Sequence, residues 1–198
     1  MISTPEHSKK RIIISPHGDI DSSLINHVSN SVSRRFGYRT EIHSLLGEID
    51  FALDSSRKQY YSTKILERLA GLAPVHAIKV LSVCQVDLFI PILTHVYGEA
   101  QLGGKACIIS TFRLNEELPA INSQDSYRQR IAKEAIHELG HTFNLRHCRD
   151  RSCGMHYCRT LRDVDNKSEE FCRYCRVLLD DELKRLSYSP SLPDNRLS

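Results

Sequence analysis

Residues 137–147 constrain this chain of 198 residues more than any other stretch. The first five of them read His-Glu-Leu-Gly-His. A helix advances about 100° per residue, so His137 and His141 lie one turn apart on one face and both imidazoles can reach one metal ion. Apolar residues gather on the opposite side of the same helix: Ala132, Ile136, Leu139 and Phe143. The segment therefore predicts a helix with a core face and a metal-binding face.

His147 adds a third imidazole six residues after His141. This spacing is too long for the same helical face, so the helix has to end between the two residues and the chain has to turn back. Asn144 lies where the stop is needed, and asparagine adopts the left-handed conformation at helix ends more readily than most residues with a side chain. Three histidines that leave the fourth position to water are typical of catalytic zinc, because structural zinc sites are normally closed by four protein ligands.

Glu138 follows the first histidine and is interpreted as a base rather than as a ligand. Zinc lowers the pKa of a bound water to about 7, and a carboxylate beside the metal can remove its proton. A surface helix with chance histidines is the plain alternative for a five-residue motif of this kind. The third histidine is the feature that argues against it.

The cysteines give a second metal signal, because five of the seven fall between Cys148 and Cys175. The N-terminus shows no apolar segment behind a basic start, so we expect no signal peptide, a cytoplasmic location and reduced thiols. Clustered thiols in such a chain more often bind a metal than form disulfides. Two close pairs offer a closed tetrahedral zinc site of the structural kind: Cys148 with Cys153, and Cys172 with Cys175.

Alternatives remain open for these cysteines. His156 and Cys158 are substitute ligands for the second site, and a redox-active pair of Cys172 and Cys175 is a rival reading. The redox reading is the weaker one, because no thioredoxin-like strand precedes the pair. Cys84 and Cys107 stand apart from this cluster in apolar surroundings. We therefore expect both to be small buried core residues.

Short apolar runs alternate with helical patterns in the first part of the chain, which predicts an α/β fold with a mostly parallel sheet. The expected strands span residues 10–15, 39–46, 77–83 and 106–110, and the expected helices span residues 21–36, 53–69 and 126–143. Residues 122–125, Asn-Ser-Gln-Asp, are typical of a helix start. Strands that alternate with helices in this way form βαβ units, with helices against the faces of the sheet.

A polar alternating run at residues 96–102 precedes a Gly-Gly break, so we expect an antiparallel strand at the exposed edge of the sheet. Such an edge can accept an extended peptide as a further strand, although an ordinary solvated edge fits the pattern as well. Asp87, His95 and Glu99 lie near this strand in the sequence. They are interpreted either as binders of a substrate N-terminus or as solvated surface groups.

The chain after Cys148 is rich in arginine and cysteine and carries little core material. A last helix is expected over residues 168–186, with the CxxC pair in its first turn. Its expected buried stripe consists of Leu178, Leu179, Leu183 and Leu186. The chain is thus expected to divide into an N-terminal subdomain (residues 1–147) ending in the zinc-binding helix, a zinc-stabilised C-terminal subdomain (148–188) and a disordered tail (189–198).

The composition limits the partners of the chain. A net charge of +3 and a pI near 8.5 are too mild to predict nucleic acid as a partner. No apolar run approaches the roughly twenty residues of a membrane span. We therefore expect no membrane partner, regard nucleic acid as an unlikely partner, and leave the oligomeric state open. A zinc-stabilised module that binds protein or RNA through its arginines is the rival class, but such a module has no use for an open three-histidine site beside a glutamate.

These residues resemble the archaemetzincins, a family within the metzincin zinc peptidases. The family pattern is HExxHxxGxxHC, four residues, Cys, one residue, Met, about seventeen residues and CxxC. The matching positions are His137, Glu138, His141, His147, Cys148, Cys153, Met155, Cys172 and Cys175. Asn144 replaces the family glycine, which agrees with the helix stop at this position. The resemblance implies a zinc peptidase that acts on a peptide or protein substrate. It also implies a twisted mixed sheet, mostly parallel with one antiparallel edge strand, and an active-site helix below that edge.

The resemblance also implies two zinc ions per chain, a catalytic ion on the three histidines with Glu138 as general base and acid, and a structural ion on the four cysteines. Met155 would form the Met-turn, an apolar floor below the imidazoles, whereas the sequence pattern alone describes a core filler. Residues 153–157 resemble the Met-turn of astacins, which makes Tyr157 a candidate transition-state stabiliser or a tyrosine packed in the turn. The alternative function is a weak or inactive metzincin scaffold that binds a peptide or partner.

Overall fold

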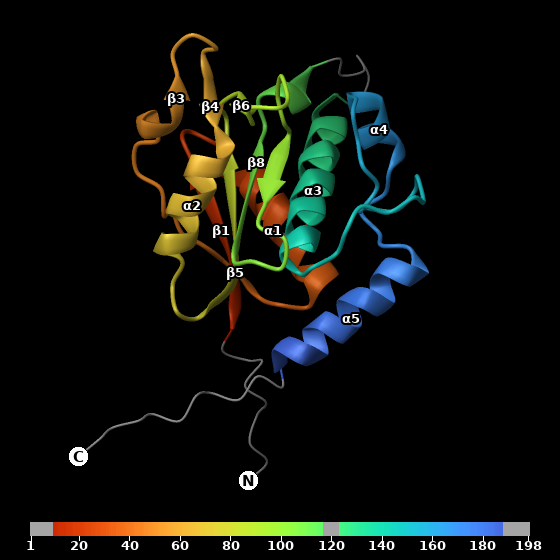
Figure 1. Ribbon diagram of the computed structural model, residues 1–198. Helices are drawn as coiled ribbons and strands as arrows, with labels where there is room; N and C mark the ends of the chain where they lie inside the picture. Colours follow the sequence, from red (N-terminus) through yellow and green to blue (C-terminus); the bar gives the residue numbers. More distant parts are fainter. Residues whose placement is uncertain (1–9, 117–122, 188–198) are drawn as a thin grey trace, which may run out of the picture.

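The computed structural model describes residues 10–116 and 123–187, and Figure 1 shows how its elements are arranged. A five-stranded sheet in the order β2-β1-β5-β8-β7 forms the centre. Its first four strands are parallel: β2 (Thr40–Ile42), β1 (Arg11–His17), β5 (Ala77–Cys84) and β8 (Ala106–Ser110). β7 (Gly98–Ala100) pairs antiparallel with β8 at the end of this sheet. The predicted mixed α/β fold with an antiparallel edge strand is therefore confirmed.

Helices cover both faces of the five-stranded sheet, because its strands send apolar side chains to both sides. Ile12 and Ile14 of β1 join one core, whereas Ile13 joins the other. Helices α1 and α3 pack in the first core, and α2 packs in the second, on the opposite side of the sheet in Figure 1. The bounds of the three are α1 (Ser22–Phe36), α2 (Ser62–Leu72) and α3 (Ser123–Thr142). Cys84 and Cys107 are buried, as the sequence predicts.

The structure contradicts the predicted helix over residues 53–69, because helical structure begins only at Ser62. The preceding residues form a 3-10 turn and a hairpin that joins a second sheet of three strands. These elements are η2 (Asp50–Ala52), β3 (Leu53–Asp54), β4 (Gln59–Tyr61) and β6 (Leu88–Phe89). The carboxylate of Asp54 accepts hydrogen bonds from the backbone N–H groups of Ser56 and Arg57 and so fixes the turn of the hairpin. This local turn outweighs the helical spacing of the apolar residues.

The second strand is also shorter than predicted, since β2 covers only Thr40–Ile42 of residues 39–46. After Ile42 the chain leaves the sheet, although the Leu45 N–H still donates to the hydroxyl of Ser15 in β1. A further 3-10 turn, η3 (Arg113–Asn115), follows β8. The asparagine of the predicted helix start, Asn122, lies outside the described residues.

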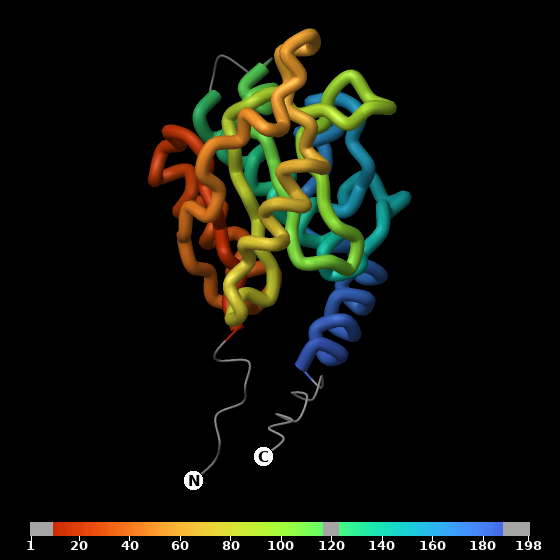
Figure 2. Tube along the Cα trace, turned by 60° about the vertical axis from the view of Figure 1, so that its left-hand side comes forward, coloured from red at the N-terminus to blue at the C-terminus, as the bar shows by residue number. Residues whose placement is uncertain are grey.

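The C-terminal part contains two helices instead of one. α5 (Arg173–Ser187) begins later than the predicted residue 168, and α4 (Leu161–Asn166) precedes it. Thr160 and Asp163 form a reciprocal capping box at the start of α4, a threonine-to-acid spacing that the sequence analysis overlooked. In the predicted stripe Leu179 is fully buried, but Leu178 is 39% exposed. Figure 2 shows α5, in blue, projecting downward from the body of the molecule.

The boundary between the two predicted subdomains stays a prediction, and the predicted tail, residues 189–198, lies outside the described residues. The C-terminal part shares the core of α1 and α3 through a set of buried side chains: Cys153, Met155, Leu161, Phe171, Cys175 and Leu179. None of the helices in the described ranges combines the length and apolarity needed to cross a lipid bilayer.

Buried charged side chains anchor α3 near its middle and at its C-terminal end. Arg130 is 1% exposed and donates to both carboxylate oxygens of Asp165 in α4, at 2.7 and 2.8 Å. The ammonium of Lys79 in β5 donates to the carbonyl oxygen of Thr142 at 2.6 Å. Burial lowers the pKa of Lys79 to about 8. Its partner lies at the C-terminal end of α3, where the helix dipole favours a cation. These contacts fix the helix that carries residues 137–142.

Asn144 ends α3 in the left-handed conformation, with φ of 64°, as the sequence predicts. Its N–H donates to the carbonyl oxygen of His141, and the N–H of Leu145 donates to that of Gly140. The chain therefore reverses within two residues and returns toward the helix, which brings the segment that follows back beside His141.

The Asn144→Ala variant should lose about 1 kcal/mol of unfolding free energy, because alanine lacks the polar side chain that eases the left-handed conformation. Asn144→Gly should stay close to the parent, since glycine adopts this conformation without strain. Urea unfolding of the zinc-loaded proteins measures both values. An equal loss in the two variants would contradict the assignment of strain to this residue.

Candidate metal sites and the cleft

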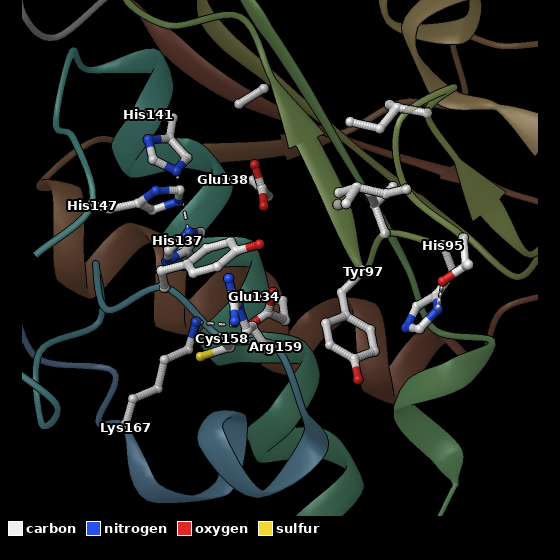
Figure 3. Close-up of a pocket in the computed structure, with 17 residues that line it drawn as sticks. His95, Tyr97, Glu134, His137, Glu138, His141, His147, Cys158, Arg159 and Lys167 are labelled. Carbon is white, nitrogen blue, oxygen red and sulfur yellow. Dashed lines mark hydrogen bonds and ion pairs between the residues drawn. The ribbon is translucent and has the colours of Figure 1, made fainter.

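Three histidines from α3 and the turn behind it converge on one point (Figure 3). The Nε2 atoms of His137 and His141 lie 3.2 Å apart. The ring centre of His147 lies 5.3 Å from that of His137 and 4.8 Å from that of His141. Two nitrogen ligands of a tetrahedral zinc ion are separated by about 3.3 Å at the usual bond lengths. The spacing of the imidazoles thus fits a shared ion.

Backbone carbonyl groups orient two of these rings. Nδ1 of His137 lies 2.8 Å from the carbonyl oxygen of Gly154, and Nδ1 of His141 lies 2.7 Å from that of Leu145. A carbonyl oxygen can only accept, so each Nδ1 carries a proton and each Nε2 keeps its lone pair. Burial lowers the pKa of His137 well below its usual value and that of His141 to about 4. Both rings are therefore neutral near pH 7, the state that binds a metal.

Glu138 lies between the histidines and the edge strand β7, as Figure 3 shows. A Cβ atom at Gly98 of β7 would stand 2.7 Å from Cγ of Glu138, so the strand passes the carboxylate closely. Burial, followed by the negative charge of Glu134, raises the pKa of Glu138 well above its usual value. Burial, followed by the positive charge of Lys167, also lowers the pKa of His147, so the third imidazole is neutral as well. A carboxylate with increased proton affinity beside three neutral imidazoles is suited to proton transfer.

Met155 and Tyr157 lie near the histidines in different ways. Met155 is fully buried, and its sulfur packs against Gly140, the helix residue directly before His141. Tyr157 is 44% exposed, with its ring centre 4.8 Å from that of His147, and it lines the cleft. Met155 thus occupies the position of an apolar floor, and the tyrosine stands at the wall.

The histidines and Glu138 open into a cleft of about 500 Å³. Its wall contains an ion pair that the sequence analysis missed, in which Nζ of Lys167 lies 2.6 Å from a carboxylate oxygen of Glu134. Arg159 also lines the cleft and was missed. Glu134 had a signal in the sequence, because it precedes Glu138 by four residues on the same helical face. Lys167, at the end of α4, had none.

The structure separates the three polar residues that were expected near the edge strand. His95 lines the cleft. Asp87 instead accepts two hydrogen bonds from Arg113, each at 2.7 Å. Glu99 accepts hydrogen bonds from the hydroxyl groups of Ser62 and Thr63 at the start of α2. The two carboxylates therefore stabilise the fold and do not line the cleft.

Four cysteines form the second group, with all sulfur atoms within 4.8 Å of one another. Sγ of Cys148 lies 3.8 Å from Sγ of Cys172, close to the roughly 3.8 Å between two thiolates on tetrahedral zinc. Cys172 directly precedes α5 and Cys175 lies in its first turn. Burial, followed by the negative charge of Cys153, raises the pKa of Cys175, so a bound cation is needed to keep all four sulfurs as thiolates.

The group contains neither of the two substitute ligands. His156 points its Nδ1 at the carbonyl oxygen of Cys148, at 3.1 Å. Cys158 lines the cleft beside Lys167, and burial raises the pKa of its thiol to about 11. The two residues therefore lie outside the four-sulfur group that the structure brings together.

Comparison with known proteins finds archaemetzincins among the relatives of this chain. The model of peptidase family M54 matches residues 47–181. The archaemetzincin of Methanopyrus kandleri is 35% identical over 165 residues, 83% of this chain and 90% of that protein. The archaemetzincin of Methanocaldococcus jannaschii is also 35% identical, over 175 residues that cover 86% of this chain and 93% of that protein.

Solved structures agree with these relatives. The crystal structure of the Methanopyrus kandleri archaemetzincin has a TM-score of 0.79 at 34% identity, covering 91% of this chain and 99% of that one. The Archaeoglobus fulgidus archaemetzincin, solved in complex with malonate, has a TM-score of 0.72 at 33% identity, covering 85% and 99%. The fold, the histidine site and these likenesses define a zinc metallopeptidase. The chain belongs to the archaemetzincins, peptidase family M54, so the resemblance seen in the sequence motifs is confirmed.

Removal of one thiol tests the cysteine group. Cys172→Ala should lower the zinc content by one ion per chain and reduce the unfolding free energy by several kcal/mol, because structural zinc contributes folding free energy directly. Metal analysis and thermal unfolding measure the two effects. Cys158→Ser is the matched control and should keep the parental zinc content. Unchanged zinc in Cys172→Ala would show that these sulfurs hold no ion.

Proposed function

We propose that this chain hydrolyses peptide bonds at a zinc ion held by His137, His141 and His147, with Glu138 as general base and acid. One observation carries the proposal: three neutral imidazoles converge beside a buried carboxylate at the floor of an open cleft. A three-nitrogen donor set that leaves one position open fits catalytic zinc. Zinc bound there would polarise the scissile carbonyl and acidify a water molecule.

The chain supplies the proton transfers. Glu138 takes a proton from the attacking water and passes it to the nitrogen of the leaving amine. Its raised pKa supports both steps, because the carboxylate holds the proton between them. The carbonyl groups of Gly154 and Leu145 keep His137 and His141 in the tautomer that ligates.

The edge strand β7 and the turn after the histidines supply the rest of the site. β7 lies above the cleft with one side unpaired among the described strands, so its backbone offers hydrogen bonds to an extended substrate. Tyr157, which lines the cleft beside His147, donates its hydroxyl to the oxyanion of the transition state. Met155 serves as the Met-turn methionine, and this role, together with the three histidines, assigns the chain to the metzincin clan.

The four cysteines hold a second zinc ion, which brings the total to two per chain. This ion joins the start of α5 to Cys148, the residue directly after the third histidine, and so defines the C-terminal subdomain from residue 148 onward. No disulfide joins any of the seven cysteines. The proposed location is the cytoplasm, where thiols stay reduced.

Replacement of the base tests this mechanism. Glu138→Gln should keep both zinc ions and lose at least about 100-fold in kcat, the range for a general acid–base group. Quenched peptide libraries measure turnover, and metal analysis measures zinc. Glu67→Gln, an exposed glutamate of α2, is the control and should match the parent. Equal turnover in Glu138→Gln and parent would remove Glu138 from the reaction.

Substitution of Gly98 tests the contact between the edge strand and Glu138. Gly98→Ala should lower kcat by about tenfold or more with zinc retained, because the new methyl group would press on the carboxylate and on the carbonyl of Ile108. Gly71→Ala is the matched control, since a Cβ there meets nothing within 4 Å. Parental turnover in Gly98→Ala would mean that β7 does not position the base.

A further inference from the structure

The charged side chains of the cleft are not spread evenly around the histidines. Figure 3 shows Glu134, Cys158, Arg159 and Lys167 together on one side of His137, away from His141. They come from three elements: the middle of α3, the segment after Met155 and the end of α4. The sequence motif includes none of these four residues, and the proposed reaction uses none of them.

Charges on this side of the cleft do not cancel. Lys167 and Glu134 neutralise each other at 2.6 Å, with side-chain exposures of 0% and 5%. Arg159 is exposed, and its guanidinium lies 5.9 Å from the ring centre of Tyr157. Within residues 10–116 and 123–187 no carboxylate forms an ion pair with this guanidinium. One positive charge is therefore left over beside the neutral pair.

Apart from the histidines and Glu138, the other described residues that line the cleft add no compensating charge. Tyr97, Thr94 and Leu93 are neutral. Burial, followed by the positive charge of Arg113, lowers the pKa of His95, so its ring is also neutral near pH 7. A substrate group that reaches this side therefore meets one unpaired cation.

The proposed reaction determines which part of a substrate reaches this side. Glu138 protonates the leaving amine, so the residue after the scissile bond lies on the Glu138 side of the metal. Glu134 precedes Glu138 by one helical turn and faces the same way. The side chain of that residue consequently projects toward Glu134 and Arg159 rather than toward His147.

We propose that Arg159, above the Glu134–Lys167 pair, binds a carboxylate carried by the substrate residue directly after the scissile bond. The inference rests on the proposed peptidase function and names its substrate class. The carboxylate comes either from an aspartate or glutamate side chain or from a free C-terminus one residue beyond the bond. A guanidinium binds either group with charge-assisted hydrogen bonds.

Basic substrate residues are disfavoured at the same place. A lysine or arginine would need Glu134 as its partner, and Glu134 could accept it only by leaving Lys167. That step would strand a fully buried ammonium without its counter-ion, which is costly in a protein interior. The buried Glu134–Lys167 pair thus disfavours basic substrate residues, and Arg159 attracts acidic ones.

Matched peptides test the preference. One series, amidated at the C-terminus, differs only in the residue after the bond, which is Glu, Gln or Lys. A second series has a neutral residue there and ends directly after it, as a free carboxylate or as an amide. The parent should cleave the Glu peptide with a kcat/KM about tenfold above the Gln peptide, and the Lys peptide most slowly. The second series shows which source of carboxylate is used.

Variants of Arg159 give the decisive readout. Arg159→Met should lower kcat/KM for the carboxylate peptide to that of the Gln peptide and leave the Gln peptide unchanged. Arg159→Glu should reverse the order of Glu and Lys. The control is Arg162→Met, an exposed arginine of α4 outside the cleft, and it should keep the parental order. High salt should shrink the preference, because exposed charges are screened.

Two results would overturn the proposal: equal kcat/KM for all peptides in the parent, or an equal loss for every peptide in Arg159→Met. A parent that cleaves no peptide would count against the proposed function instead. In that case the affinities of zinc-loaded Glu138→Gln for the Glu and Gln peptides still test the carboxylate site. Tighter binding of the Glu peptide supports it, and equal binding removes it.

Discussion

The stop of α3 at Thr142 is the constraint on which the rest of this structure depends. The helix has to be continuous through His137 and His141 to present two imidazoles on one face, and it has to end at once so that His147 can return to them. Asn144 makes the reversal in the left-handed conformation. Lys79, which is buried inside a parallel strand, donates to the last carbonyl of the helix and thereby holds the stop in place. A longer helix would carry His147 away from the metal and leave Lys79 without this acceptor.

The features that the sequence predicted well are those that depend on local chemistry at fixed spacing. The three histidines, the asparagine stop and the two cysteine pairs follow from helical geometry and from the ligand preferences of zinc, so each is visible in the chain before folding. The parallel sheet was also predictable, because strands that alternate with helices along the chain form βαβ units. The helix predicted over residues 53–69 is wrong only before Ser62. There the side chain of Asp54 ties its own backbone into a turn, and hydrophobic periodicity does not register this competition.

The features that the sequence did not predict are long-range pairs of buried charges. Arg130 meets Asp165, and Lys167 meets Glu134, over separations of 35 and 33 residues. Nothing local marks such residues as buried, since lysine and arginine are normally exposed. Once α3 and α4 lie side by side, however, each cation needs its own counter-ion, because an unpaired charge in the interior is costly. These pairs specify how the C-terminal part docks on the active-site helix, and one of them ends up as the wall of the cleft.

The three histidines and the four-sulfur group are coupled through the chain itself, because His147 and Cys148 are consecutive residues. The N–H of Cys148 donates to the carbonyl oxygen of Met155 at 2.8 Å, and the carbonyl oxygen of Gly154 orients the ring of His137. Cys153, one residue before Gly154, belongs to the four-sulfur group. An ion that fixes the four sulfurs therefore also fixes the carbonyl that sets the tautomer of His137 and the methionine beneath the helix. The four-sulfur group thus supports the histidines from outside. Disorder of the thiols would reach His147 through its neighbour Cys148, and it would reach the ring of His137 through Cys153 and the adjacent Gly154.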